Sequence, residues 1–222
     1  MRLVALVVVV LLAANGFALR PSLAGSAEMW LVLASAYVVL SAVALYAMWN
    51  DGTLVERLAP RWGDISLGAI TAIVLVVASW GARAALAPAG SAQSAWLLRV
   101  YLQIGPPERI QRSVELTLLV MLVPALEELV WRGLVLGRLT DRFGQRRGWP
   151  LAALLYAAAL LPSVFLLADP AAGPNPLLIV AALGCGIVWS FMASIGGRLS
   201  PVIISHVAFT YFAALQFRWP GM

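Results

Sequence analysis

The sequence predicts an all-α, polytopic membrane helix bundle that crosses the bilayer about seven times. Of its 222 residues, 62% are hydrophobic and only 11% are charged, and the mean hydropathy is +0.91. Soluble domains carry roughly 25% charged residues, so this composition excludes a soluble domain held by one membrane anchor. The length leaves no room for a second domain of useful size, and we expect one transmembrane domain over residues 1–222.

Seven apolar stretches are long enough to be transmembrane helices, because about 20 apolar residues span a hydrocarbon core of ~30 Å. The first could instead be a secretory signal peptide, whose removal would leave the other helices in the same orientation. A further apolar stretch, Ser94–Ile104, is too short to cross and predicts a helix that lies in the membrane interface. The seven predicted spans cover residues 3–19, 27–49, 66–88, 113–137, 149–168, 176–196 and 200–217.

The arginines predict how these helices are oriented, since cytoplasmic loops carry an excess of positive charge. All fifteen basic residues are arginine, and the densest cluster lies between the fourth and fifth spans. The loop from Asp169 to Pro176 has no basic residue, as expected for an external turn. Placing the dense cluster in the cytoplasm puts the amino terminus there too, together with eight arginines: Arg2, Arg57, Arg61, Arg138, Arg142, Arg146, Arg147 and Arg198.

The net charge of +5 would suggest a nucleic-acid partner if the chain were soluble. Here the arginines lie in predicted loops and are explained as determinants of topology. We therefore expect the lipid bilayer, and no nucleic acid, as a partner. The alanine- and arginine-rich composition is typical of a GC-rich bacterial proteome, which predicts a multi-pass protein of the bacterial inner (cell) membrane.

Three ionisable side chains stand in the middle of the fourth apolar run: Glu127, Glu128 and Arg132. A charged side chain at mid-bilayer costs at least roughly 2.5–3.5 kcal/mol, so such residues are rare and indicate a functional site. Glu128 and Arg132 are four residues apart, share a helix face and can neutralise each other. Glu127 is rotated by about 100° from Glu128 and has Trp131 at its own i+4 position. We therefore expect Glu127 to need a partner on another helix, a wet cavity or a proton.

Helix-breaking and small residues surround these charges. Pro124 lies one turn before the glutamates and predicts an opened helix with a freed backbone carbonyl. Gly133 and Gly137 form a small-xxx-small step that allows another helix to approach closely. Charged groups, a helix break and a close-packing face thus fall within about four helical turns, as a buried site requires.

The last span carries the second polar feature, His206 and Thr210, four residues apart on one helix face. The alternative is a purely structural role, in which His206 bonds between helices and Thr210 bonds back to its own helix. Because His206 is the only histidine and Cys185 the only cysteine, we expect no metal site and no cofactor. Ser205 points to a different helix face from His206, which argues against serine proteolysis.

At these positions the chain resembles the CPBP family of intramembrane proteases, which includes CAAX prenyl endopeptidases and bacteriocin-immunity-type relatives. The family pattern is EExxxR on one helix, FxxxH on the next and HxxxN on a later one. Glu127, Glu128 and Arg132 match the first motif completely, and its last two residues would hold the helices in register. The resemblance covers roughly the second half of the chain and implies a protease-like core at residues 113–217.

The other two motifs depart from the family pattern. Tyr156 stands at the aromatic position of the second motif, but the histidine position is Leu160. His206 stands at the histidine position of the third motif, but the asparagine position is Thr210. At helical spacing Leu160 lies one turn beyond Tyr156, so both are expected to face the fourth span.

The resemblance also implies roles for these residues. The family's catalytic glutamate corresponds to Glu127, which would activate water. The family's later histidine and asparagine, here His206 and Thr210, would stabilise the oxyanion. Leucine cannot accept a proton, so Leu160 removes the histidine that works with the glutamate on the water.

Chemical requirements lead to the same hypothesis without the family. Peptide hydrolysis inside a membrane needs a base for water, a donor for the oxyanion and a wet pocket. We expect a glutamic-type endopeptidase that cleaves a membrane-associated protein or carboxy-terminal tail, with Glu127 as base and His206 with Thr210 as donors. One alternative is a catalytically silent family member that binds a hydrophobic or lipidated segment. The other is a proton-coupled transporter, which the lack of an internal repeat makes less favoured.

Overall fold

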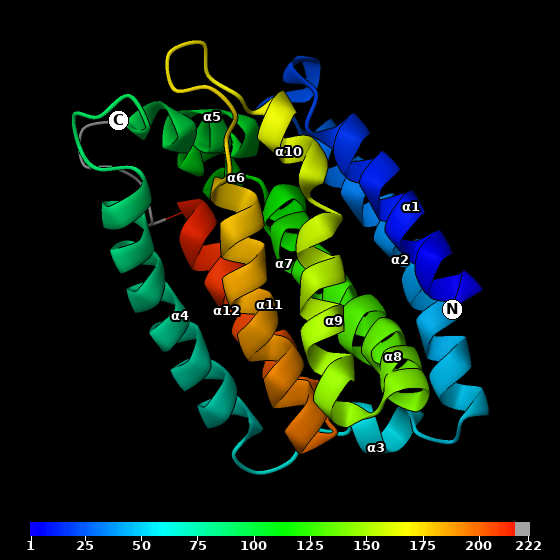
Figure 1. Ribbon diagram of the computed structural model, residues 1–222. Helices are drawn as coiled ribbons and strands as arrows, with labels where there is room; N and C mark the ends of the chain where they lie inside the picture. The colour runs from blue at the N-terminus through cyan, green and yellow to red at the C-terminus, as the bar shows by residue number, and fades with distance from the viewer. Residues whose placement is uncertain (216–222) are drawn as a thin grey trace.

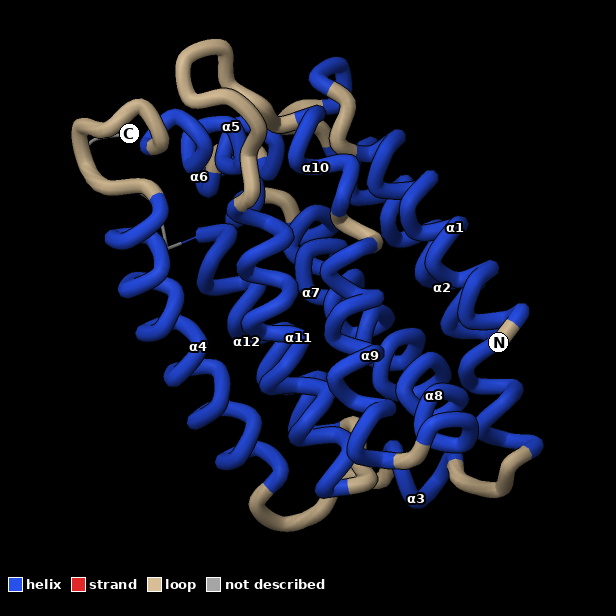
Figure 2. The backbone as a smooth tube through the Cα atoms, viewed as in Figure 1, coloured by secondary structure: helices blue, strands red, loops and turns tan. Residues whose placement is uncertain are grey.

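The computed structural model describes residues 1–215, and within them every regular element is a helix (Figure 1). Figure 2 shows long helical rods joined by loops, with no strand in the described part of the chain. The predicted all-α helix bundle is confirmed. The elements are α1 (Arg2–Ala18), η1 (Pro21–Leu23), α2 (Ala27–Asn50), α3 (Leu54–Leu58), α4 (Asp64–Leu86), α5 (Ser94–Ile104), α6 (Pro107–Arg112), α7 (Val114–Glu128), η2 (Leu129–Val135), α8 (Leu136–Phe143), α9 (Gln145–Ala158), α10 (Leu161–Leu166), α11 (Leu177–Gly196) and α12 (Ser200–Leu215).

Several of these helices are long and apolar enough to cross a membrane. Among the described residues they are α2, α4, the α9–α10 pair and α11, while α1 and α12 are shorter apolar helices. The fourth predicted span is the rod formed by α7, η2 and α8. The chain is therefore a multi-pass membrane protein. The last predicted span and the predicted core both end at residue 217, and residues 216 and 217 lie outside the described part.

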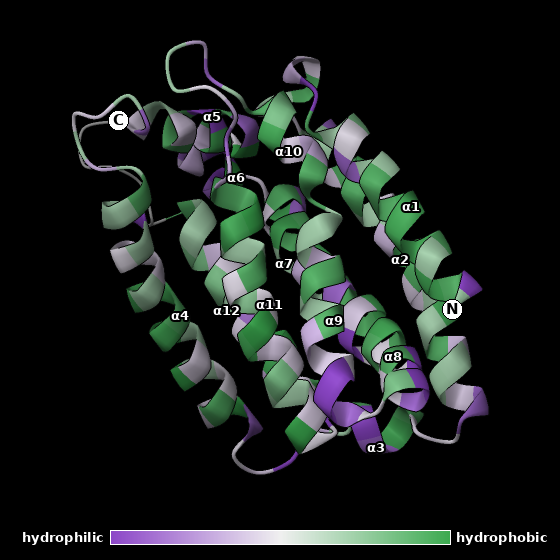
Figure 3. Ribbon diagram, in the orientation of Figure 1, coloured by the Kyte–Doolittle hydropathy of each residue, from purple (hydrophilic) through white to green (hydrophobic). Residues whose placement is uncertain are grey.

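The two ends of the bundle differ in polarity. The helix predicted to lie in the interface, α5, has the predicted bounds and runs across one end, whereas α3 lies at the opposite end (Figure 1). Hydrophilic residues gather around α3 and the α8–α9 junction (Figure 3), where the predicted arginine cluster lies. Along the side, α4 exposes a row of large apolar side chains, as a lipid-facing helix does: Ile65, Leu67, Ile70, Ile73, Val74, Val77 and Trp80.

Two glycines bring helices into close contact at places that the sequence pattern did not predict. A Cβ atom at Gly68 would lie 2.8 Å from the Pro201 carbonyl oxygen, so α4 and α12 approach backbone to backbone. A Cβ atom at Gly186 would lie 3.5 Å from the backbone of Ala153, so α11 crosses α9 there. At Gly133, in the predicted small-xxx-small step, the nearest atoms belong to side chains instead. Close helix crossings therefore lie on α4 and α11, and a Cβ atom at Gly148 of α9, which would lie 3.0 Å from the backbone of Thr140, marks another between α8 and α9.

The fourth rod contains a π-helical segment directly after the two glutamates. Contrary to the prediction, the helix does not open at Pro124, because α7 continues through it to Glu128. A proline removes one backbone donor, and here the rest of α7 tolerates that loss. The irregular geometry comes one turn later, in η2, where Arg57 donates to the Gly133 carbonyl at 3.0 Å. Such π-helical turns are frequent at functional sites.

A break at residues 159–160 divides the fifth predicted span into α9 and α10, which together are long enough to cross a membrane. Pro162 causes it, because proline has no N–H and its ring clashes with the carbonyl four residues earlier. Asn15 on α1 stabilises the break by donating its side-chain amide to the Ala159 carbonyl at 3.1 Å. Leu160 therefore lies in a turn rather than on a helix face shared with Tyr156.

Candidate active site

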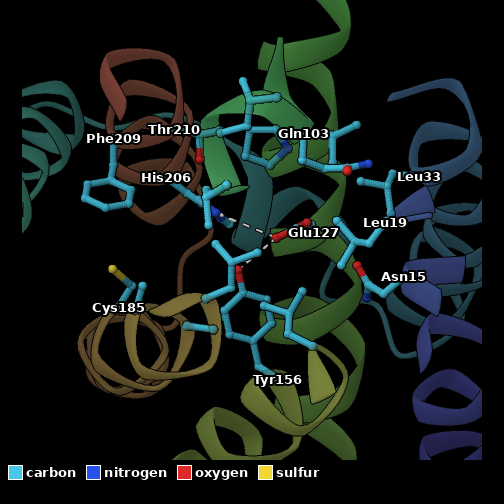
Figure 4. A pocket seen from close by; sticks show the side chains of 18 of the residues that line it. Asn15, Leu19, Leu33, Gln103, Glu127, Tyr156, Cys185, His206, Phe209 and Thr210 are labelled. Atoms are coloured by element: carbon cyan, nitrogen blue, oxygen red, sulfur yellow. Dashed lines mark hydrogen bonds and ion pairs between the residues drawn. The ribbon is translucent and has the colours of Figure 1, made fainter. Parts of the chain in front are cut away.

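A cavity of about 220 Å³ lies inside the bundle, beside the fourth rod (Figure 4). Its walls come from α1, α2, α5, α7, α11 and α12 and from the α9–α10 region. Most of the lining is apolar, with a few polar groups that can orient a bound molecule. The amide, carboxylate, hydroxyl, thiol and imidazole side chains that line it are Asn15, Gln103, Glu127, Tyr156, Cys185, His206 and Thr210.

The carboxylate of Glu127 lies in this cavity between two other helices. Tyr156 on α9 donates its hydroxyl to Oε2 of Glu127 at 2.9 Å, and Nε2 of His206 on α12 lies 3.6 Å from the same oxygen. Both contacts are drawn in Figure 4. The side chain of Glu127 is 16% exposed, whereas that of Glu128 is 0% exposed. The two adjacent glutamates thus differ in their access to the cavity.

The imidazole of His206 is held on both ring nitrogens and on one ring face. Nδ1 lies 2.6 Å from Oε1 of Glu128. A carboxylate can only accept, so we assign a proton to Nδ1. The ring stacks on Trp189 with centroids 3.8 Å apart and an angle of 29° between the planes. Nε2 is therefore the nitrogen that faces Glu127 and the cavity.

A sealed ion pair joins Glu128 to Arg132 on the far side of His206 from the cavity. Nη1 of Arg132 donates to Oε1 of Glu128 at 3.0 Å, and Nη2 donates to the Gly186 carbonyl at 3.4 Å. Both side chains are 0% exposed. The guanidinium also lies 4.7 Å from the centre of the Tyr156 ring, in cation–π range. Removing Glu128 would leave the charge of Arg132 buried without its anion.

The two positions that depart from the family motifs also line the cavity. Thr210 lies one turn beyond His206 on α12, and its hydroxyl has no hydrogen-bond partner within residues 1–215. Leu160, at the break between α9 and α10, contributes an aliphatic wall. The structure thus brings both positions to the cavity that holds Glu127 and Tyr156. Of the predicted site residues, only the sealed ion pair lies outside the cavity lining.

Sequence reasoning missed several parts of the site. Tyr156 was considered only as an aromatic motif position, although its hydroxyl binds a glutamate. Trp189 supports the ring of His206, and no sequence pattern connects these two residues. Asn15 lines the cavity from the first apolar span and Gln103 from the predicted interfacial helix, and neither was predicted as a site residue. A polar residue inside the first apolar span was the available signal for Asn15.

The arrangement is suited to acid–base chemistry. A carboxylate, an imidazole and two hydroxyl groups surround a space into which a substrate can enter. Among residues 1–215, no group of three or more His, Cys, Asp or Glu side chains is arranged to hold a metal ion. Cys185 is a free, buried thiol in the cavity wall.

Comparison with known protein families agrees with this geometry. Residues 110–212 match the family described as type II CAAX prenyl endopeptidase Rce1-like, so the predicted resemblance is confirmed. The match runs from α6 to α12 and includes every motif position named above. No curated protein and no solved structure matches the chain. Over residues 110–212 the chain is therefore similar to the Rce1-like CAAX prenyl endopeptidases, a family of proteases.

Proposed function

We propose that this chain is an intramembrane endopeptidase of glutamic type, with residues 113–217 as the protease core of a single transmembrane domain. The main support is the carboxylate of Glu127, which lines a cavity within a membrane span and lies 3.6 Å from Nε2 of His206. Ionisable groups at this depth are costly and mark functional sites. The family match supports the class of reaction.

In the first step, Glu127 takes a proton from a water molecule, and the water oxygen attacks the carbonyl carbon of the scissile peptide bond. Tyr156 holds one carboxylate oxygen of Glu127, and we assign the water to the other. The carbonyl oxygen becomes an oxyanion. We assign the Thr210 hydroxyl and Nε2–H of His206 as its donors, with the imidazole protonated on both nitrogens.

In the second step, the tetrahedral intermediate collapses and its C–N bond breaks. Glu127 gives the proton that it took from water to the leaving nitrogen, so the products are a carboxylic acid and an amine. The enzyme regains its starting protonation state. Glu128 takes no proton in this scheme and positions His206 through the 2.6 Å contact to Nδ1.

The proposed substrate is an apolar carboxy-terminal tail or membrane segment of another protein. A helix in the bilayer hides its peptide bonds, so the segment must be unwound before water can attack it. The cavity of about 220 Å³ is small for a ligand pocket and holds only a short stretch of chain. If the arginine-rich end faces the bacterial cytoplasm, as we propose, the cavity lies toward the external end, since α5 contributes to its wall.

Cleavage by the purified protein in lipid nanodiscs tests this proposal. The probes are a prenylated peptide ending in Cys-aliphatic-aliphatic-X and a set of apolar single-span peptides. We expect Glu127→Gln to lower cleavage by about 10²-fold or more, with an unchanged unfolding temperature. Glu115→Gln is the matched control, because Glu115 is an exposed glutamate on the same helix. Equal cleavage by Glu127→Gln and the wild type would overturn the assignment of the base.

Leu160 favours a second candidate function, binding without cleavage. Its aliphatic side chain lines the cavity and offers no proton acceptor where the family has a histidine. A silent family member would bind the prenylated peptide in this cavity and would leave every probe intact. Binding of the probe without any Glu127-dependent cleavage would favour this second function.

A further inference from the structure

The cavity wall across from His206 carries two buried carboxamides, and neither lies in the segment that matches the family. Asn15 belongs to α1 and Gln103 to α5, and they are 5% and 4% exposed. Both line the cavity. Figure 4 shows them on the other side of Glu127 from His206 and Thr210.

Backbone contacts fix the orientation of both carboxamides. Nδ2 of Asn15 donates to the carbonyls of Leu11 at 2.9 Å and Ala159 at 3.1 Å. Nε2 of Gln103 donates to the carbonyl of Ala18 at 3.0 Å. A backbone carbonyl can only accept, so the NH₂ groups face these carbonyls and the amide oxygens face away from them.

The two amide oxygens are acceptors without a donor. No group in residues 1–215 donates a hydrogen bond to the side-chain oxygen of Asn15 or Gln103. Neither oxygen is among the sealed polar atoms that lack a partner, so both oxygens are reachable from the cavity that these side chains line. Two acceptors from different helices thus line one cavity. A ligand that donates hydrogen bonds would satisfy both.

We propose that Asn15 and Gln103 form a substrate subsite that accepts hydrogen bonds from the backbone N–H groups of an unwound polypeptide. This inference rests on the proposed function and describes how its substrate is held. Unwinding leaves N–H and C=O groups without their helical partners in an apolar environment. The α12 wall offers donors and the α1–α5 wall offers acceptors, so a peptide between them is satisfied on both sides. Glu127 lies between the two walls, next to the bond to be cut.

A polypeptide fits these acceptors better than a lipid does. Lipid tails carry no hydrogen-bond donor. Asn15 lies inside an apolar helix that packs in the bundle. Two acceptors on separate helices require a ligand with donors at regular intervals, and a peptide backbone supplies one at every residue except proline.

Backbone ester substitution tests the subsite. The probe is the prenylated peptide, with one amide N–H at a time replaced by an ester oxygen. Its affinity is measured with the Glu127→Gln protein in nanodiscs, so the probe stays intact and the readout does not depend on catalysis. We expect the ester at one or two positions to weaken binding by about five- to tenfold, as for the loss of one hydrogen bond. In a Gln103→Met or Asn15→Leu background, the ester should no longer weaken binding at the peptide position whose N–H the replaced amide oxygen would accept.

The matched control is Gln93→Met, which makes the same chemical change at an exposed residue next to the start of α5. The ester penalty should persist in this control. The subsite would be overturned if the ester and amide probes bind the Glu127→Gln protein with equal affinity at every position. This comparison does not require any variant of Asn15 or Gln103 to fold. A penalty that persists in both cavity variants would also overturn the subsite.

Two further outcomes distinguish a bound peptide from a bound lipid, and the subsite from the proposed function. Prenylcysteine methyl ester contains no peptide bond and serves as the lipid-like probe. If this probe binds in a Gln103-dependent way, while ester substitution in the peptide has no effect on peptide binding, the amide oxygens of Asn15 and Gln103 bind a lipid. That result would overturn the proposal. An ester penalty that depends on Gln103, combined with no cleavage by the wild type, would overturn the proposed function and support the subsite.

Discussion

Glu127 and Glu128 are neighbours in the sequence but belong to two different regions of the molecule. Glu128 lies in a sealed network, where Oε1 contacts Arg132 at 3.0 Å and His206 at 2.6 Å. Glu127 lies in the cavity, held by Tyr156 and by a longer contact to His206. A rotation of about 100° along the helix is enough to separate them. In our proposal, charge compensation, rather than depth in the membrane, distinguishes the structural carboxylate of Glu128 from the reactive carboxylate of Glu127.

His206 connects the two regions. Its Nδ1 is bound closely on the network side, whereas Nε2 lies 3.6 Å from Glu127 on the cavity side. The stack on Trp189 fixes the plane of the ring. The network therefore orients an imidazole nitrogen toward the cavity, and changes in each region should have different consequences.

The largest effect on folding is expected from the network. Arg132→Ala breaks the buried ion pair and leaves Glu128 with His206 as its remaining partner, so the free energy of unfolding should fall by up to roughly 3–5 kcal/mol. Denaturant unfolding in detergent micelles measures it. Arg138→Ala is the control, since Arg138 forms surface ion pairs, which contribute only about 0–1 kcal/mol. If both variants lose a similarly small amount of free energy of unfolding, the buried network does not stabilise the folded protein.

The next largest effect is expected from restoring a proton acceptor to the cavity. Leu160→His places an imidazole at a cavity-lining turn and should raise cleavage by some part of the ~10²–10⁴-fold that one acid–base group contributes. The gain should vanish when Glu127→Gln is added. Leu161→His, at an exposed neighbouring residue, should give no gain. A folded Leu160→His protein that cuts no faster than the wild type would contradict this role for position 160.

A smaller effect is expected at the hydroxyl that holds Glu127. Tyr156→Phe removes the 2.9 Å hydrogen bond to Oε2 but keeps the ring, which packs edge-to-face on Trp131 with centroids 5.5 Å apart. We expect kcat/KM to fall by about tenfold, because hydrogen bonds to charged groups are stronger than neutral ones. The unfolding temperature should change little. An unchanged kcat/KM would show that Glu127 is positioned by other contacts.

The smallest effect is expected far from both regions, at the end of the bundle near α5. The pKa of Asp169 lies below its ordinary value because the Ala171 N–H donates to the carboxylate, with further donation from Ala172 and Arg99. Because the pKa of Asp169 is lower in the folded state, its ionised carboxylate stabilises the folded protein above about pH 4. This stabilisation is lost as the pH falls through the pKa of Asp169 in the folded state. Asp169→Asn should therefore lower the unfolding temperature slightly at neutral pH.

The same comparison measured in acid checks the sign of this prediction. Once both folded and unfolded Asp169 are protonated, the carboxyl group no longer favours the folded state, and the difference between Asp169→Asn and the wild type should shrink. A difference that grows as the pH falls would contradict the lowered pKa.

The sequence predicted the features that depend on local patterns. Apolar length predicted the long helices, and amphipathic length predicted Ser94–Ile104 with its observed bounds. The i,i+4 spacing of Glu128 and Arg132 predicted which residues would pair, because it depends only on helix geometry. Motif positions pointed to His206 and Thr210, which the structure places on the wall of one cavity.

The features that were missed depend on contacts between distant parts of the chain. Asn15 contacts the Ala159 carbonyl 144 residues away, and only packing of α1 against the α9–α10 break brings them together. The break itself had a local cause in Pro162, which the sequence prediction of this span did not use. The position of η2 depends on partners such as Arg57 that satisfy its carbonyls from outside the helix. Local pattern predicts helices and pairs on one helix, and tertiary packing determines irregular turns and cavity walls.

The most direct test of the difference between the two glutamates measures Glu127→Gln and Glu128→Gln side by side, for cleavage of the same probe and for the free energy of unfolding. For Glu127→Gln we predict cleavage lower by about 10²-fold or more and a nearly unchanged free energy of unfolding. For Glu128→Gln we predict a large loss of free energy of unfolding, because Arg132 is left buried without its anion. The opposite pattern, or full cleavage by the Glu127→Gln protein, would contradict the assignment of Glu127 as the base.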